Sequence, residues 1–157
     1  MSRTLRPAAF ALTGVCIFAL ALGHDVPVAA QVRPSAIVSA LGRCLDVSSA
    51  NSGNGAAIQL YDCNGTPAQQ WFVEGSRIRS ALGRCLDVSA ANSGNGASLQ
   101  LYDCNGTPAQ TWTVPRTGPI VSALGRCLDV SSANSGNGAS LQLYDCNGTP
   151  AQTWTLR

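Results

Sequence analysis

Cysteines carry the chemistry that the sequence shows most directly. Six of the seven fall into three pairs whose members are 19 positions apart: Cys44 and Cys63, Cys85 and Cys104, and Cys127 and Cys146. An even number of cysteines in an exported chain indicates disulfides. Several pairings are open, and the regular spacing favours the bonds within each pair. Each such bond would add about 3 kcal/mol to stability in the chain-entropy model.

Other reactive residues are scarce beyond residue 30. That stretch has no His, no Lys, no Cys-x-x-Cys pair and a single Glu, Glu74. Zinc ligation and Ser-His-Asp catalysis are therefore excluded, and only a pair of Asp residues could carry out glycoside hydrolysis. We expect a protein with no metal, no cofactor and no enzymatic activity.

The cysteine pairs recur because one 33-residue stretch occurs three times, at 39–71, 80–112 and 122–154. The middle copy differs from the last only at Ala90. The first copy differs from the last at Ala57, Ile58 and Gln70. A Trp ends each copy, and these residues are 41 and then 42 positions apart: Trp71, Trp112 and Trp154. Such a period indicates one supersecondary unit that is packed three times.

Each copy has the pattern of strands joined by turns. In the first copy, residues 57–63 alternate between apolar and polar side chains, as a half-buried strand does. Shorter apolar runs at 37–41, 44–47 and 69–73 predict three further strands. The intervening stretches are rich in Gly, Asn, Ser and Pro, which favour turns. Because no segment has a helical period, the sequence predicts an all-β fold of twelve strands, four in each repeat.

Alternation also assigns faces to the side chains. Leu60 is expected to point inward, and Gln59 and Tyr61 outward. If Cys44 and Cys63 are bonded, Asp46 meets Gln59 and Tyr61 on one outer surface. Asp62 and its copies are expected to point inward and cap backbone amides.

The first thirty residues have the features of a secretory signal. Two Arg precede a short apolar run, and Val28-Ala29-Ala30 offers the small residues that a signal peptidase reads. A retained membrane anchor is the alternative, and the shortness of the run argues against it. Residues 31–157 then form one secreted domain. Its eight Arg and seven acidic residues leave a net charge near +1, which gives no reason to expect binding to nucleic acid or insertion into a membrane.

A closed threefold arrangement fits the three repeats, which span about 37–77, 78–118 and 119–157. Three blades are fewer than propellers use. An open solenoid needs capping repeats, and the terminal copies here are as regular as the middle one. The joints between copies, 72–79 and 113–121, are where the repeats diverge, so they are expected to hold connecting strands and loops.

Three copies of Cys-Leu-Asp-Val, of Leu/Ile-Gln-Leu-Tyr-Asp-Cys and of Gln-x-Trp resemble the ricin B-type lectins, including the family 13 carbohydrate-binding modules. The resemblance covers residue 37 to the end. It implies a β-trefoil with pseudo-threefold symmetry, a core that contains the three Trp side chains, and disulfides within each repeat. It also implies binding of carbohydrate.

The resemblance implies four sugar-binding positions in each repeat. An Asp accepts sugar hydroxyls, a Tyr stacks on the pyranose, an Asn follows the second cysteine, and the Gln of the Gln-x-Trp motif supports the Asp or touches sugar. These residues are Asp46, Tyr61, Asn64 and Gln69, then Asp87, Tyr102, Asn105 and Gln110, then Asp129, Tyr144, Asn147 and Gln152. Many members have Asn before that Gln, where this chain has Ala68, Ala109 and Ala151.

Each of these residues also has a plainer reading. Asp46 could cap the 48–55 turn, Tyr61 could cover the disulfide, and Asn64 could serve only its own turn. We nevertheless interpret the chain as a secreted, monomeric, multivalent lectin with up to three equivalent sites. The expected ligands are galactose-type sugars or plant or microbial polysaccharide. The alternatives, in order, are a trefoil protease inhibitor or toxin-like effector, and a glycoside hydrolase.

Overall fold

The computed structural model describes residues 33–157, so the expected signal at 1–30 lies outside the described residues. The first repeat contains strands β1 (Ile37–Ser39), β2 (Cys44–Val47), β3 (Ala56–Tyr61) and β4 (Trp71–Glu74). The second contains β5 (Arg77–Ser80), β6 (Cys85–Val88), β7 (Ala97–Tyr102) and β8 (Trp112–Thr113). The third contains β10 (Val121–Ser122), β11 (Cys127–Val130), β12 (Ala139–Tyr144) and β13 (Trp154–Leu156).

Short 3-10 turns follow the second and third strands of each repeat. They are η1 (Ser48–Ala50) and η2 (Pro67–Gln69), η3 (Ser89–Ala91) and η4 (Pro108–Gln110), and η5 (Ser131–Ala133) and η6 (Pro150–Gln152). The twelve expected strands are all present. A thirteenth, β9 (Thr117–Gly118), lies in the second joint and pairs with β13. The joint was expected to hold connecting strands, but β9 was not counted among the twelve because two residues are too few to show an alternating pattern.

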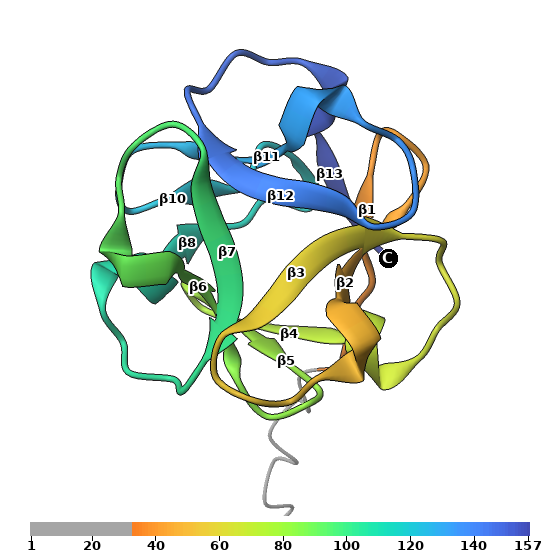
Figure 1. The fold of residues 1–157 in the computed structure, drawn as a ribbon, viewed down its shortest axis with the longest axis vertical. Helices are drawn as coiled ribbons and strands as arrows, with labels where there is room; N and C mark the ends of the chain where they lie inside the picture. Colours follow the sequence, from red (N-terminus) through yellow and green to blue (C-terminus); the bar gives the residue numbers. More distant parts are fainter. Residues whose placement is uncertain (1–32) are drawn as a thin grey trace, which may run out of the picture. The chain divides into compact units, whose positions relative to one another are not determined.

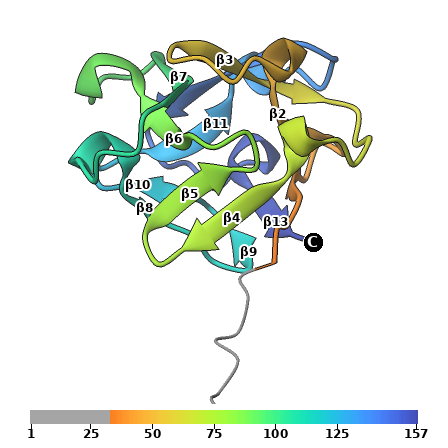
Figure 2. The same cartoon turned by 90° about the horizontal axis from the view of Figure 1, so that it is seen from below.

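The three longest strands form a triangle at the centre of the view in Figure 1. Each of β3, β7 and β12 pairs with the other two, so the three repeats meet in a closed ring. Seen from the side in Figure 2, the β4–β5 hairpin, β9 and β13 lie at the opposite end from β3 and β7. This arrangement is a β-trefoil, as the resemblance to the ricin B-type lectins implies. Among the described residues, no helix has the length and apolarity needed to cross a membrane.

The core is organised around the three Trp side chains. Trp71, Trp112 and Trp154 are each at most 2% exposed, which confirms their expected core position. Each indole Nε1 donates to the carbonyl oxygen of the Leu in the second strand of its own repeat, at 3.0–3.1 Å. The polar edge of each ring is therefore satisfied where it is buried.

Three disulfides join the second strand of each repeat to the segment just after the third strand. They are Cys44–Cys63, Cys85–Cys104 and Cys127–Cys146, each with a Cα–Cα distance of 5.1 Å. All three lie within a repeat, as the spacing predicts. Each bond closes a loop with a sequence separation of 19 residues, which is long enough to stabilise the fold by about 3 kcal/mol.

Three polar clusters, which we call clamps, join each repeat to a neighbour. Each contains an Arg and an Asp from one repeat and an Asn from another: Arg43, Asp62 and Asn137; Arg84, Asp103 and Asn54; and Arg126, Asp145 and Asn95. The Asp side chains are 64–66% exposed, so the expectation that they point inward is wrong. They lie one residue beyond the third strand, where strand alternation no longer applies.

Candidate functional site

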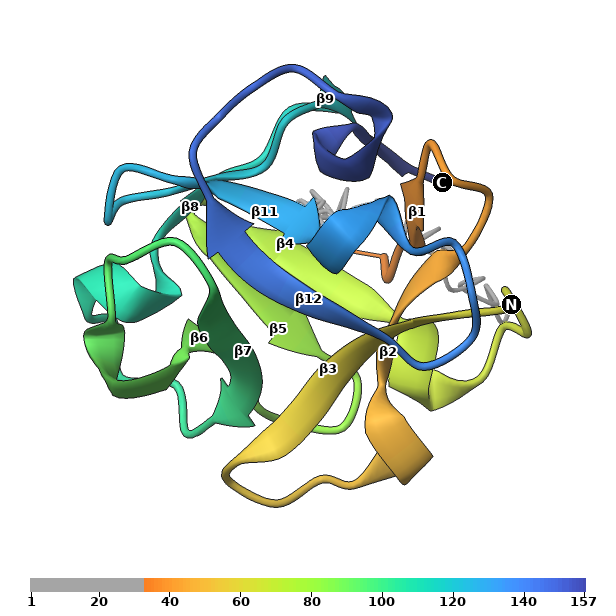
Figure 3. The same cartoon turned by 45° about the horizontal axis from the view of Figure 1, so that its top comes forward.

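Each repeat has one pocket on the face that carries β3, β7 and β12, and the residues that line the three pockets correspond. The first pocket has a volume of about 450 Å³ and is lined by Asp46, Val47, Ser48, Ser49, Ala50, Gln59, Tyr61, Asn64, Thr66 and Ala68. The pockets of the second and third repeats measure about 280 Å³ and about 500 Å³. Figure 3 shows this face tilted forward, with the 3-10 turns around the central strands.

A carboxylate forms the floor of each pocket. Asp46 on β2 lies directly opposite Gln59 on β3, and Gln59 Nε2 donates to Asp46 Oδ1 at 2.8 Å. Asp46 is on the predicted face, but it is only 5% exposed rather than at the outer surface. Asp87 and Asp129 are equally buried, and each accepts a hydrogen bond from the equivalent glutamine, Gln100 and Gln142 respectively. Gln59 was not predicted as a pocket residue, although its place opposite Asp46 follows from the strand pattern.

The Gln of the Gln-x-Trp motif holds this carboxylate from below. Gln69 is 1% exposed, and its Nε2 donates to Asp46 Oδ2 at 3.0 Å and to the carbonyl oxygen of Asp62 at 2.8 Å. Its Oε1 accepts the backbone N–H of Asn64 at 2.8 Å. Gln110 and Gln152 repeat these contacts. Gln69 does not line the pocket, so its position favours supporting Asp46 over touching a ligand.

Each carboxylate oxygen therefore accepts one amide hydrogen bond from a Gln. Because each such oxygen has two lone pairs, every pocket keeps acceptor capacity that no described residue uses. The other four acidic residues within 33–157 are each paired with an Arg: Asp62, Glu74, Asp103 and Asp145. The pocket carboxylates have no such cation among the described residues. Each pocket is thus an acceptor of hydroxyl or amine hydrogens.

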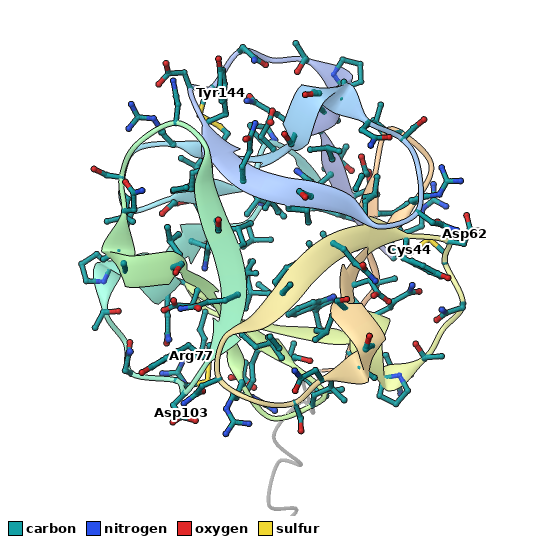
Figure 4. The ribbon with its side chains drawn as sticks, viewed as in Figure 1. Cys44, Asp62, Arg77, Asp103 and Tyr144 are labelled. Carbon is teal, nitrogen blue, oxygen red and sulfur yellow. A yellow bond between two sulfur atoms is a disulfide. The ribbon has the colours of Figure 1, made fainter. Side chains whose placement is uncertain are left out.

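A tyrosine ring forms one wall of each pocket. Tyr61 lies two residues after Gln59 on β3, so both side chains share a face. Tyr61, Tyr102 and Tyr144 are 39–41% exposed and are the only exposed large hydrophobic side chains in residues 33–157. Figure 4 places Tyr144 near the periphery, well away from Asp62 and Asp103 in the other repeats. An exposed ring beside a carboxylate provides a stacking surface and an acceptor together.

A strained backbone segment also lines each pocket. Ser49 and Ala50, in η1, have φ angles of 56° and 50°, which non-Gly residues seldom adopt. The equivalent pairs Ala90–Ala91 and Ser132–Ala133 have nearly the same angles. Such conformations cost about 1–3 kcal/mol each and gather at ligand sites. Nothing in the sequence indicated this segment, because neither Ser nor Ala signals a left-handed backbone.

The loop after the second cysteine completes the pocket. Asn64 Oδ1 accepts the backbone N–H of Thr66 at 3.0 Å and the Thr66 hydroxyl at 2.7 Å. Asn64 therefore serves its own turn and also lines the pocket, which combines the two roles considered for it. Asn105 and Asn147 do the same. Ala68, where the resemblance implies a polar donor, contributes a methyl group to the lining.

Two ionisable groups outside the pockets have pKa values that are held low by their neighbours. The hydrogen bond from Arg79 lowers the pKa of Glu74 in the β4–β5 hairpin. The hydrogen bond from Asn54 lowers the pKa of Asp103 in its clamp. Within residues 33–157, no group of three or more His, Cys, Asp or Glu side chains is placed to hold a metal ion.

Comparison with known proteins identifies this arrangement. A family model described as the ricin-type beta-trefoil lectin domain matches residues 33–154. No curated protein sequence matches the chain.

Solved structures with the same fold include a designed and two natural proteins. The designed threefold-symmetric protein ThreeFoil has 27% identity and a TM-score of 0.73, with 78% of this chain covering 96% of that one. An exo-β-1,3-galactanase from Clostridium thermocellum has 28% identity and a TM-score of 0.74, with 81% of this chain covering 30% of that one. The agglutinin from Abrus precatorius has 26% identity and a TM-score of 0.70, with 78% of this chain covering 47% of that one.

Proposed function

Because this chain belongs to the ricin-type β-trefoil lectin domains, a family of carbohydrate-binding proteins, we propose that residues 31–157 form a secreted, monomeric lectin with three sites for galactose-type sugars. The sugar-binding residues are those of the three pockets. Asp46, Tyr61 and Asn64 contact the sugar in the first repeat, and Gln69 holds Asp46 in position. The equivalent residues act in the other two repeats.

One observation carries the proposal. In each pocket, a carboxylate with unused lone pairs lies on the floor and an exposed tyrosine ring forms the wall. A pyranose has an apolar face, which stacks on an aromatic ring, and hydroxyl groups, which donate to a carboxylate. In galactose-type sugars the axial 4-hydroxyl leaves the C–H groups of C3, C4 and C5 on one face, with the 3- and 4-hydroxyls at its edge, whereas the C–H groups of glucose alternate between the two faces. The likeness to a β-1,3-galactanase supports this choice.

Each site should bind a single sugar weakly, with a Kd on the order of 0.1–1 mM, because an open pocket buries little of its ligand. Three such sites on one rigid domain can engage a polysaccharide together. Avidity should then exceed single-site affinity by about 100-fold if the sugar spacing fits the sites. The three disulfides are consistent with a secreted protein, because such bonds persist in oxidising surroundings.

The test is retention of the purified domain on immobilised β-1,3-galactan. We expect retention, elution by free galactose, and much weaker elution by the same concentration of glucose. Equal elution by both sugars would contradict the galactose preference. Failure to bind any member of a glycan array that includes galactosides would contradict the lectin function itself. Size-exclusion chromatography with light scattering tests the proposed monomer.

A further inference from the structure

The sequence contains six Asn-Gly dipeptides, two in each repeat. Three lie in the sugar pockets, at Asn64, Asn105 and Asn147, and three lie in the clamps, at Asn54, Asn95 and Asn137. Asn-Gly is the dipeptide most open to spontaneous deamidation, because glycine has no Cβ to hinder attack by its own nitrogen. All six Asn side chains belong to exposed residues. Exposure therefore predicts no difference in deamidation between the pocket and the clamp residues, whereas their hydrogen bonds do.

In the clamps, both groups that would react are held by hydrogen bonds: the side-chain amide of the Asn and the backbone nitrogen of the Gly that follows it. Asn54 Oδ1 accepts Arg84 Nε at 2.7 Å and the Asp103 backbone N–H at 2.8 Å, and Asn54 Nδ2 donates to Asp103 Oδ2 at 2.8 Å. The N–H of Gly55 donates to the carbonyl oxygen of Leu101 at 2.9 Å. The nucleophilic nitrogen is thus occupied and the amide cannot turn toward it. The other two clamps repeat this, with Gly96 donating to Leu143 and Gly138 to Leu60.

The pocket residues lack this protection. The N–H groups of Gly65, Gly106 and Gly148 donate to no acceptor within the described part of the chain. At Asn64, only Oδ1 is engaged, by the backbone N–H and the hydroxyl of Thr66. Two donors on the amide oxygen polarise the carbonyl group and stabilise negative charge that develops on it. Asn54 Oδ1 in the clamp also accepts two donors, so the contacts at the oxygen do not distinguish the two groups. The difference lies in the bonded Nδ2 and the bonded glycine N–H of the clamp.

We propose that Asn64, Asn105 and Asn147 are sites of spontaneous deamidation, and that Asn54, Asn95 and Asn137 are protected by the clamps. Hydroxide removes the proton from the Gly65 nitrogen, which attacks Cγ of Asn64 and forms a C–N bond. The side-chain nitrogen takes up a proton and leaves as ammonia. Water then opens the cyclic imide to aspartate or isoaspartate. No oxidant, reductant or cofactor is needed.

The product changes the sugar pocket. Each event adds a negative charge to a pocket whose floor is already a carboxylate, and isoaspartate also lengthens the loop backbone by one atom. Because the Asn64 backbone N–H donates to Gln69, which in turn donates to Asp46, the change reaches the support of the pocket floor. This consequence rests on the proposed function, and the modification itself does not. The pockets would lose affinity for sugar as the protein ages, while the clamps that join the repeats stay intact.

The chain provides an internal control for the test. Trypsin cleaves after Arg, and the reduced peptides 44–77, 85–116 and 127–157 each contain one pocket and one clamp Asn-Gly. The purified protein is incubated at mildly alkaline pH before digestion, and fragmentation in the mass spectrometer locates the modified residue. We expect deamidation at the pocket position of each peptide to be at least about tenfold faster than at its clamp position, because clamp opening must first break several hydrogen bonds.

Two variants sharpen the result. Arg84→Ala should speed deamidation at Asn54 alone and leave Asn95 and Asn137 protected. Thr66→Val should slow deamidation at Asn64 alone. Equal rates at the two positions of each wild-type peptide, or faster reaction in the clamps, would overturn the proposal even if both variants failed to fold. Binding of aged and fresh protein to galactan is measured separately. Fresh protein that does not bind would reject the proposed function and leave the peptide result to decide the modification.

Discussion

The pockets and the clamps each contain an Asp and an Asn that is followed by Gly, yet they differ in how completely their polar groups are paired. In the clamp, Arg84, Asp103 and Asn54 satisfy one another across two repeats. In the pocket, Asp46 keeps unused acceptor capacity beside an exposed ring and a strained backbone. The clamp, whose polar groups are paired with one another, joins neighbouring repeats. The pocket, whose carboxylate can still accept hydrogen bonds, is available to a ligand.

The largest expected effect comes from removing the pocket walls. The triple variant Tyr61→Ala, Tyr102→Ala and Tyr144→Ala should lose retention on galactan, because both the stacking surface and the avidity are removed. The rings are 39–41% exposed, so the circular dichroism spectrum should not change. The matched triple Tyr→Phe variant keeps the rings and should retain binding. Retention by a folded Ala variant would show that the pockets serve the fold alone.

Breaking a disulfide should lower the stability of the fold and leave sugar binding in the other two repeats unchanged. Cys85→Ser with Cys104→Ser should lower the free energy of unfolding by about 3 kcal/mol, since the unfolded chain regains the entropy of the open loop. Denaturant titration measures this loss. Binding at the pockets of the first and third repeats should persist below the unfolding transition. A loss well under 1 kcal/mol would contradict the entropic account.

Breaking a clamp should lower stability less than breaking a disulfide does, and it should leave sugar binding unchanged. Arg84→Ala removes hydrogen bonds to Asn54 and to the carbonyl of Ser52. The free energy of unfolding should fall by about 1 kcal/mol, a value reduced by the partial exposure of the side chain. Affinity for galactose should not change. A clamp variant that lost sugar binding with unchanged stability would invalidate the division between the two clusters.

Restoring a hydroxyl should tighten the middle site slightly. The second pocket has Ala90 where the others have Ser49 and Ser132, and its volume is the smallest at about 280 Å³. One added hydrogen bond to a ligand is worth about 0.5–1.5 kcal/mol, so Ala90→Ser should improve that site by about threefold to tenfold. Calorimetry on variants in which the other two Tyr residues are Ala isolates the effect. The reverse change, Ser132→Ala, should weaken the third site by a similar factor, and no change in either variant would show that this hydroxyl does not contact the sugar.

Acidification should have the smallest effect, by weakening the clamp that contains Asp103. The pKa of Asp103 is lowered in the folded protein, chiefly by its hydrogen bond from Asn54. Its contribution to stability is present above the unfolded pKa and is lost as the pH falls through the folded pKa. The melting temperature should therefore decline below about pH 4. In Asp103→Asn this part of the decline should be absent, and an identical pH profile would show that the charge has no part in stability.

Strand alternation and repetition predicted most of this fold. The positions of Leu60, Gln59 and Tyr61 follow from a period of two, and the disulfides from the regular spacing of the cysteines. The buried Trp side chains were implied by the resemblance to the ricin B-type lectins. Asp62 was placed wrongly because it lies beyond the end of β3, where neighbours from another repeat decide its orientation. The clamps as a whole depend on contacts between distant residues, such as Arg43 and Asn137, which a single sequence does not reveal.

The pockets were predicted only in part for a similar reason. The strand pattern brought Asp46, Gln59 and Tyr61 to one face, but it did not predict that Gln59 would line the pocket. The segment made by Ser49 and Ala50 depends on positive φ angles that these residue types do not signal. The buried depth of Asp46 depends on Gln69, the last residue of the 3-10 turn η2, whose side chain donates to the carboxylate.

The central claim is that three equivalent pockets bind sugar, and a site-resolved titration tests it most directly. The side-chain amides of Gln59, Gln100 and Gln142 each report on the carboxylate of one pocket. In a ¹⁵N-labelled protein titrated with galactose, we expect all three amide signals to shift and to saturate with Kd values on the order of 0.1–1 mM. Shifts confined to one of the three signals, or to none while the sugar binds elsewhere, would contradict the claim.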